Sequence, residues 1–120
     1  MAPTFASLDC RLNALVARVW SSTDIPRRRA HLASRLTKAQ RRMTNAERLC
    51  RISHAKAARD RLERVIHALT RFGRGLRWER GRRFMPAALR VELTVAEQGI
   101  RDSLHTLRRT LQCPNAALGG

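Results

Sequence analysis

The sequence predicts an all-α protein: a compact bundle of four to five amphipathic helices with an arginine- and glycine-rich loop at 73–86. Apolar residues repeat at gaps of three and four along several stretches, which is typical of helices with one buried face. The motifs at 44–47 and 94–97 have the form of capping boxes, which mark helix starts. A chain of 120 residues forms one small domain. We expect this domain at 1–114 and a mobile tail at 115–120.

The first two helices are predicted from two apolar stripes. The first stripe ends near Trp20 and consists of Leu8, Leu12, Leu15, Val16 and Val19. Thr4 or Ser7 is placed to cap its start. The polar residues at 21–24 end this helix, and a second helix begins near Pro26, since proline is tolerated in a first turn. Its core face holds Leu32, Leu36, Ala39 and Met43.

The later helices are predicted from the two capping boxes and from two further stripes. The box at 44–47 indicates either a new helix or a bend in a long one. The stripe that follows predicts the longest helix, with Gly73 and Gly75 at its end, and contains Ala55, Ala58, Leu62, Val65, Leu69 and Phe72. Pro86 closes the arginine-rich loop and begins a short helical turn through Leu93. The box at 94–97 then starts the last helix, which Pro114 ends.

The formal net charge of +16 indicates a polyanionic partner, with nucleic acid favoured over an anionic membrane. Two regions concentrate this charge. One is a helical strip without an acid, formed by Arg27, Arg28, Arg29, Arg35, Lys38, Arg41 and Arg42. The other lies in the segment 71–86, where Phe72, Trp78 and Phe84 alternate with basic residues. Its candidate nucleic-acid-binding residues are Arg71, Arg74, Arg77, Trp78, Arg80, Arg82 and Arg83.

These residue types suit contacts with a nucleic-acid backbone and with stacked bases. Guanidinium groups bind phosphate through two parallel hydrogen bonds, and exposed aromatic faces stack on bases. The alternative interpretation is a solvated basic surface, because charged runs on helices usually face water. Spaced pairs such as Asp60 and Arg64 also form simple ion pairs within a helix. We favour the interpretation as a nucleic-acid interface.

The three cysteines, Cys10, Cys50 and Cys113, are odd in number and widely spaced. This pattern argues against a disulfide framework and for a reducing compartment, so we expect a cytoplasmic protein. A mitochondrial transit peptide at 1–22 is the less favoured alternative. The apolar stretches are one or two helical turns long, and we expect no membrane association.

We expect neither a metal ion, nor a cofactor, nor enzymatic activity. Cys50 and His54 stand four residues apart on one helix face, which is half of a metal site, but no second spaced pair of ligands accompanies them. No phosphate-binding glycine loop or nucleophile motif is present. Glu47 and Glu97 are interpreted as members of the capping boxes.

In size, charge and helicity the chain resembles the small helical-bundle subunits of CRISPR effector complexes, which line guide and target strands, and is similar to small basic ribosomal proteins. The resemblance covers the whole chain without a matching motif, so it assigns no residue roles. It implies a non-catalytic subunit of a ribonucleoprotein assembly that grips RNA or single-stranded DNA and contacts partner proteins.

Two alternatives remain open. A winged helix-turn-helix DNA-binding regulator would have helices at 44–52 and 53–69 and a two-stranded wing at 76–85 that turns at Arg80 and Gly81. An amphipathic protein held on anionic membranes is the other alternative, and the leucine- and alanine-rich helix faces argue against it.

Overall fold

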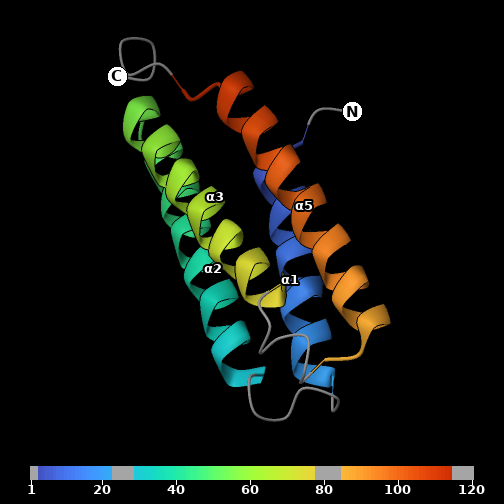
Figure 1. Ribbon diagram of the computed structural model, residues 1–120. Helices are drawn as coiled ribbons and strands as arrows, with labels where there is room; N and C mark the ends of the chain where they lie inside the picture. The colour runs from blue at the N-terminus through green and yellow to red at the C-terminus, as the bar shows by residue number, and fades with distance from the viewer. Residues whose placement is uncertain (1–2, 23–28, 78–84, 115–120) are drawn as a thin grey trace.

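The structure, a computed structural model, describes residues 3–22, 29–77 and 85–114. Four α-helices make up these ranges: α1 (Phe5–Ser21), α2 (Arg29–Arg51), α3 (Ala55–Arg77) and α5 (Ala87–Thr110). The expected all-α bundle is confirmed, and the described ranges contain no β-strand. Each helix runs antiparallel to the next along the chain, in the up-down-up-down order of a helical bundle (Figure 1).

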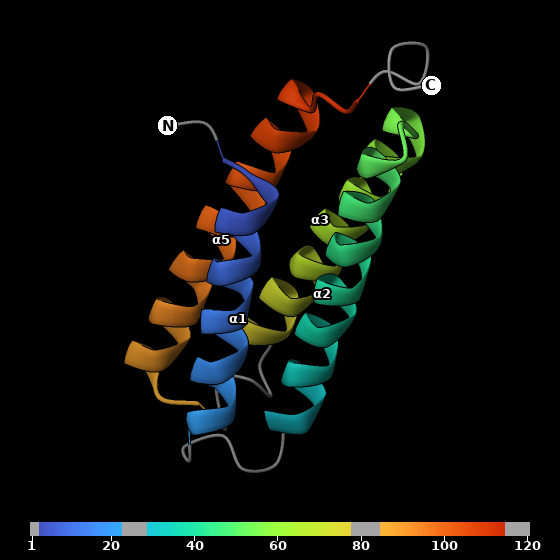
Figure 2. The ribbon, with the colours of Figure 1, turned by 180° about the vertical axis from the view of Figure 1, so that it is seen from behind.

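The four helices form a ring of neighbours around one core. Both ribbon views show α2 beside α3 and α1 beside α5, with the two pairs packed against each other (Figures 1 and 2). The molecule is elongated, with extents of 54 × 24 × 20 Å. Within the described part of the chain, no helix has the length and apolar character needed to cross a membrane.

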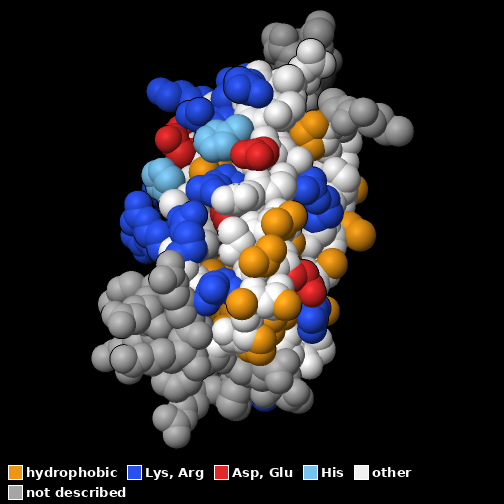
Figure 3. Space-filling model, turned by 45° about the vertical axis from the view of Figure 1, so that its right-hand side comes forward, with side chains coloured by type: hydrophobic (Ala, Val, Ile, Leu, Met, Phe, Trp, Pro, Cys, Tyr) orange, Lys and Arg blue, Asp and Glu red, His pale blue; other side chains and the backbone are white. Residues whose placement is uncertain are grey.

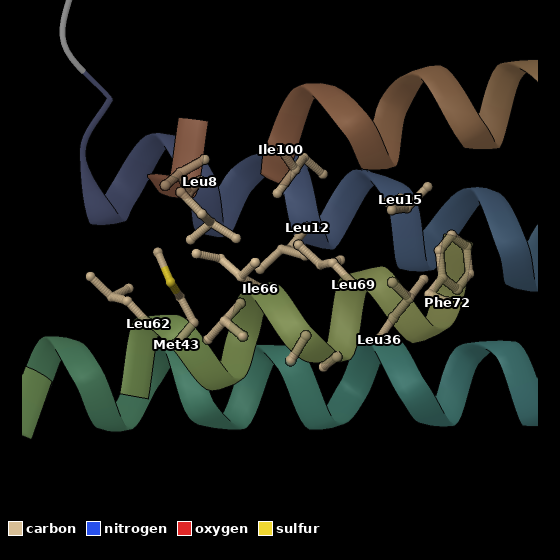
Figure 4. Packing of buried hydrophobic residues seen from close by; sticks show 14 of the residues in the cluster. Leu8, Leu12, Leu15, Leu36, Met43, Leu62, Ile66, Leu69, Phe72 and Ile100 are labelled. Carbon is tan, nitrogen blue, oxygen red and sulfur yellow. The ribbon is translucent and has the colours of Figure 1, made fainter. Parts of the chain in front are cut away.

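Most members of the predicted stripes are buried in the core, with Val16 and Ala55 only partly buried. Buried side chains from all four helices point toward one another along the bundle axis (Figure 4). In α1, which begins with the predicted cap, Thr4 Oγ1 accepts a hydrogen bond from Ser7 N at 3.1 Å, while Ser7 Oγ accepts one from Thr4 N at 3.0 Å. The reciprocal pair satisfies amides that the first helical turn leaves without intrahelical partners.

Both capping boxes lie inside helices, so the predicted helix start at 94 is wrong, and of the two interpretations of the box at 44–47 the new helix is excluded. Thr44 Oγ1 donates to the carbonyl of Gln40 at 3.1 Å, the bond that a threonine makes in a helix interior. Glu47 pairs with Arg51 at 2.6 Å, one turn onward. Residues 94–97 belong to α5, which already begins at Ala87, directly after Pro86. The short turn and the last helix of the prediction are therefore one helix.

The break between α2 and α3 lies at 52–54 and involves no glycine. Ser53 has φ of 69°, in the left-handed region, and the amide of His54 donates to the carbonyl of Leu49 at 2.8 Å. A residue in this conformation reverses the chain after a helix. The winged helix-turn-helix alternative places a helix break at this point, between 52 and 53, but α2 begins well before 44 and α3 continues past 69. Leu76 and Arg77 lie in α3 rather than in a wing strand.

The predicted end of the third helix is also wrong, because α3 continues through Gly73 and Gly75 to Arg77. Phe72 and Leu76 are fully buried, so this part of the arginine-rich segment is a core helix. The predicted loop therefore does not include 73–77. Residues 78–84, the predicted turn at Arg80 and Gly81, and the predicted tail at 115–120 lie outside the described residues.

A disulfide bond joins Cys50, near the end of α2, to Cys113, beyond the end of α5. The expectation against disulfides is therefore wrong. Cysteines 63 positions apart in the sequence are brought together because α2 and α5 both end at the same end of the bundle (Figure 1). Cys10, the third cysteine, is free and exposed on α1.

Candidate functional site

A cationic groove runs between α2 and α3, in the half of α2 nearest its N-terminus. This groove is an open hollow of about 230 Å³, and its lining residues are His31, Ser34, Arg35, Lys38, Arg42, Ala68 and Arg71. The α2 members recur every three or four residues, so they share one side of that helix. The groove therefore combines part of the predicted strip on α2 with Arg71 from the predicted arginine-rich segment.

Two arginines of the groove are held by the backbone of the opposite helix. Arg35 Nη1 donates to the carbonyl of Arg71 at 2.9 Å, and Arg42 Nη1 donates to the carbonyl of Arg64 at 3.4 Å. A guanidinium group has five N–H donors in a rigid plane, so one such bond orients the group and leaves further donors for a ligand. These contacts orient the planar guanidinium groups so that their remaining N–H donors can bind an anion such as phosphate.

Four of the described acidic side chains form ion pairs outside the groove. Ion pairs of the described residues join Arg18 to Glu92, Arg51 to Glu47, Arg101 to Glu97 and Arg108 to Glu63. Within the same residues, no carboxylate lines the groove or pairs with its basic side chains. Among the residues that the structure describes, no carboxylate therefore neutralises Arg35, Lys38, Arg42 and Arg71 in this groove.

The charge of the bundle is divided between its two helix pairs. α2 carries seven basic residues and one acid, and α3 carries seven and two. α1 carries two basic residues and one acid, and α5 four and three. The α2/α3 side is thus strongly cationic and the α1/α5 side is close to neutral. Such an asymmetric field orients an approaching polyanion toward α2 and α3.

The structure places the other predicted residues in different surroundings. Arg29 is turned toward Trp20, with its guanidinium carbon 5.8 Å from the ring centroid and Nη1 donating to the Trp20 carbonyl at 3.2 Å. Arg41 lines a separate shallow hollow with Thr37, Gln40, Thr44 and Asn45. Arg74 and Arg77 are exposed on α3. The remaining predicted residues, Arg27, Arg28, Trp78, Arg80, Arg82 and Arg83, lie outside the described residues.

His31, Ser34 and Ala68 line the groove although the sequence reasoning did not select them. A signal was present for His31, which precedes Arg35 by one helical turn and so falls on the same side of α2. Ser34 precedes Lys38 by the same spacing, but its uncharged side chain does not distinguish it from other polar residues. Ala68 cannot be recognised from the sequence, because it lines the groove only through the packing of α3 against α2.

Among the described residues, the most buried charged side chain is that of Glu97, which lies between α3 and α5 and does not line the groove. Its side chain is 1% exposed, and Arg101 Nε lies 3.1 Å from Oε1. Burial raises the pKa of Glu97 above its ordinary value, and the positive charges of Arg101 and Arg77 oppose this rise. The interpretation of Glu97 as a cap is wrong, because Glu97 lies in the interior of α5 and its carboxylate is buried against Gly73 of α3.

Two further carboxyl groups have shifted pKa values. A hydrogen bond from Arg18 lowers the pKa of Glu92, whose Oε2 accepts from Arg18 Nε at 2.5 Å. Partial burial, followed by the negative charge of Glu47, raises the pKa of Asp9. Both groups lie outside the groove, so neither changes its charge directly.

A metal site at Cys50 and His54 is not available, because Cys50 is bonded to Cys113. Elsewhere in the described ranges, no three residues among histidine, cysteine, aspartate and glutamate gather closely enough to hold an ion.

Neither protein-family models, nor curated proteins, nor solved structures give a match to this chain.

Proposed function

We propose that the chain binds the phosphate backbone of RNA or single-stranded DNA in the groove between α2 and α3. The observation that carries this proposal is the concentration of Arg35, Lys38, Arg42 and Arg71 in one groove whose described lining contains no carboxylate. Phosphate contacts of this kind give affinity without reading bases. The predicted role as a non-catalytic subunit of a ribonucleoprotein assembly, similar in type to CRISPR small subunits or small ribosomal proteins, extends this proposal.

The geometry supports an extended strand as the ligand. The α2 side of the groove runs from His31 to Arg42, a distance of about 16 Å along the helix axis, since each helical residue rises about 1.5 Å. α2 begins and α3 ends at the same end of the bundle, nearest this groove (Figure 1). Arg27, Arg28 and the arginines at 80–83 stay candidate contacts from the sequence alone.

A cytoplasmic location stays a prediction of the sequence, and one finding argues against it. A disulfide between Cys50 and Cys113 favours an oxidising compartment, because cytosolic thiols are kept reduced. Alkylation of free thiols in intact cells, followed by mass spectrometry, tests the localisation. Alkylated Cys50 and Cys113 support the cytoplasm, whereas a protected pair contradicts it.

The experiment for the function measures fluorescence anisotropy of labelled RNA, single-stranded DNA and duplex DNA across a salt series. The groove variant is Lys38→Gln/Arg42→Gln/Arg71→Gln. Loss of three phosphate contacts should weaken single-strand binding about tenfold or more and reduce the slope of log K against log salt by about 2. Circular dichroism checks that helicity is unchanged.

A matched control removes the same charge from other surfaces: Lys56→Gln/Arg90→Gln/Arg109→Gln. It should bind within about threefold of the wild type, because only long-range attraction is reduced. Equal losses in both variants would assign binding to net charge and overturn the groove as the site. Absence of wild-type binding at low salt would overturn the function, and a strong preference for one duplex sequence would favour the regulator alternative.

A further inference from the structure

The two halves of the disulfide between Cys50 and Cys113 lie in different surroundings. Cys50 is in the last turn of α2, and the residue is 7% exposed. Cys113 follows the end of α5, in residues 111–114 that form no regular secondary structure, and it is partly exposed. The attack of an external thiolate on a disulfide depends on access to the attacked sulfur. The Cys113 side of this bond is therefore the more open to attack.

The backbone on the two sides of the bond differs in the same sense. The carbonyl of Cys50 accepts a hydrogen bond from the amide of Ser53 at 3.0 Å, so the turn after α2 fixes the chain at this cysteine. On the other side Leu111 is the anchor, because it is 6% exposed and its carbonyl accepts from Arg59 Nη2 at 3.3 Å. Cys113 lies beyond this anchor. It therefore has more freedom than Cys50 to turn its sulfur toward an incoming thiol.

The Cys50 side of the bond has a hydrogen-bond acceptor for the thiol that an attack on Cys113 would release. Cys50 Sγ lies 3.7 Å from the carbonyl oxygen of Gln112. Once the bond is opened, the Cys50 thiol can donate a hydrogen bond to this oxygen. The Cα atoms of the two cysteines are 4.9 Å apart. The released thiol therefore stays beside Cys113 and can attack it again.

Positive charge at this end of the bundle favours an anionic thiol as the attacking molecule. Arg59, which contacts the Leu111 carbonyl, is exposed on α3, and Arg109 is exposed in the last turn of α5. Among the ion pairs of the described residues, none involves either arginine. A space-filling view shows lysine and arginine side chains, in blue, at the end of the molecule where α5 ends (Figure 3). Such a field raises the local concentration of a small anion.

We propose that Cys113 is a site of reversible modification, at which a small anionic thiol exchanges with the disulfide of the folded protein. The thiolate attacks Cys113 Sγ and forms a new S–S bond with it. The bond between Cys113 and Cys50 breaks, and Cys50 leaves as a thiolate that takes up a proton from water. One disulfide replaces another, so the step needs no further oxidant or reductant.

The reverse step uses the same two cysteines. Attack of the Cys50 thiolate on Cys113 Sγ expels the small thiol and restores the original bond. Cys50 is therefore the resolving thiol of the modification. The proposal does not depend on nucleic-acid binding, because neither cysteine lines the groove between α2 and α3.

The test uses glutathione as the thiol and the variant Cys10→Ser, because the free and exposed Cys10 would form an adduct of its own. Samples are blocked with excess N-ethylmaleimide at successive times, and mass spectrometry after proteolysis locates glutathione and maleimide. Extrapolated to zero time, glutathione on Cys113 with maleimide on Cys50 should exceed the reverse arrangement by about tenfold. In concentrated urea the two arrangements should form in about equal amounts, because unfolding removes the difference in access.

Glutathione found chiefly on Cys50 in the folded protein overturns the proposal, and so does the same distribution with and without urea. Exchange that occurs only in urea also overturns it, because the bond is then inaccessible in the native bundle.

The preference for an anionic thiol is tested by the salt dependence of the exchange rate, with each thiol as its own reference. The glutathione rate should fall about threefold or more between low salt and about 1 M, where the screening length is about 3 Å, and the rate for neutral mercaptoethanol should stay constant. Arg59→Gln should reduce this fall. Arg90→Gln removes the same charge near the start of α5, at the opposite end of the bundle, and should leave the fall unchanged. A glutathione rate that does not change with salt overturns the assignment to an anionic thiol.

Discussion

The carboxylate of Glu97 on α5 lies directly against Gly73 on α3. A Cβ placed on Gly73 would come within 3.0 Å of Glu97 Oε2 and 3.3 Å of Cδ. Glu97 Oε1 accepts no hydrogen bond from any described residue, although Arg101 Nε lies 3.1 Å away. Because Gly73 has no side chain, the space beside its Cα is free for the buried carboxylate of Glu97.

Gly73→Ala should be less stable than Gly75→Ala by about 1–2 kcal/mol in urea unfolding. Alanine in a helix interior ordinarily gains up to about 1 kcal/mol over glycine. At Gly75 that gain should be realised, because the new Cβ meets only Leu32 Cδ2 at 3.6 Å. At Gly73 the new methyl group displaces a buried carboxylate. Equal gains at the two positions would show that Glu97 moves aside without loss.

Stability should fall as pH rises above the ordinary carboxyl pKa of 4.5, in the range where Glu97 ionises in the folded state. Because burial raises the pKa of Glu97 in the folded protein, the folded state holds this proton more tightly than the unfolded state does. Glu97→Gln cannot ionise, so its stability should fall less over the same range. Melting temperatures of both proteins across a pH series measure the difference. A difference that stays constant with pH contradicts the assignment.

Removal of the disulfide should lower stability by about 4 kcal/mol, the chain-entropy value for a 63-residue separation. The test compares the double variant Cys50→Ser/Cys113→Ser with the wild type in urea unfolding without reductant. Cys10→Ser is the control and should unfold like the wild type, because Cys10 is exposed and unbonded. Thiol titration of the native wild type should find one reactive thiol per chain. Three thiols would contradict the bond.

The contributions to nucleic-acid binding of the arginines at 80–83 and of the groove can be compared with variants that remove the same number of positive charges. Arg80→Gln/Arg82→Gln/Arg83→Gln removes three positive charges, as the groove variant does. If these residues contact phosphate, single-strand affinity should fall about tenfold and helicity should stay constant. Anisotropy measurements at fixed salt provide the comparison. Binding equal to that of the wild type would restrict the interface to the groove between α2 and α3.

The helical stripes and the all-α class were predictable because burial of apolar residues at regular spacing follows from helix geometry alone. Helix boundaries were less predictable. Thr44 and Glu47 have the form of a capping box. In the interior of α2, however, Thr44 donates to the carbonyl of Gln40 and Glu47 pairs with Arg51. The break at Ser53 could not be predicted from a glycine, because the residue with positive φ is a serine.

Contacts between distant residues could not be derived from the sequence. From the sequence, Gly73 is expected to end a helix. The structure shows that Gly73 lies inside α3 and that Glu97 occupies the space beside it. The pairing of Cys50 with Cys113 depends on both helices ending together. For the candidate site, the basic residues on α2 were predictable from charge. Their convergence with Arg71 required the packing of α2 against α3.

The bond between Cys50 and Cys113 closes a covalent ring that contains the whole of α3 and α5. A single cut of the backbone inside this ring leaves both pieces attached, so the fragments separate only after reduction. A mechanical load applied at the two chain ends is carried across the sulfur bridge and bypasses the ring. In the oxidised protein, therefore, pulling extends α1 and α2 while the polypeptide of α3 and α5 bears no tension.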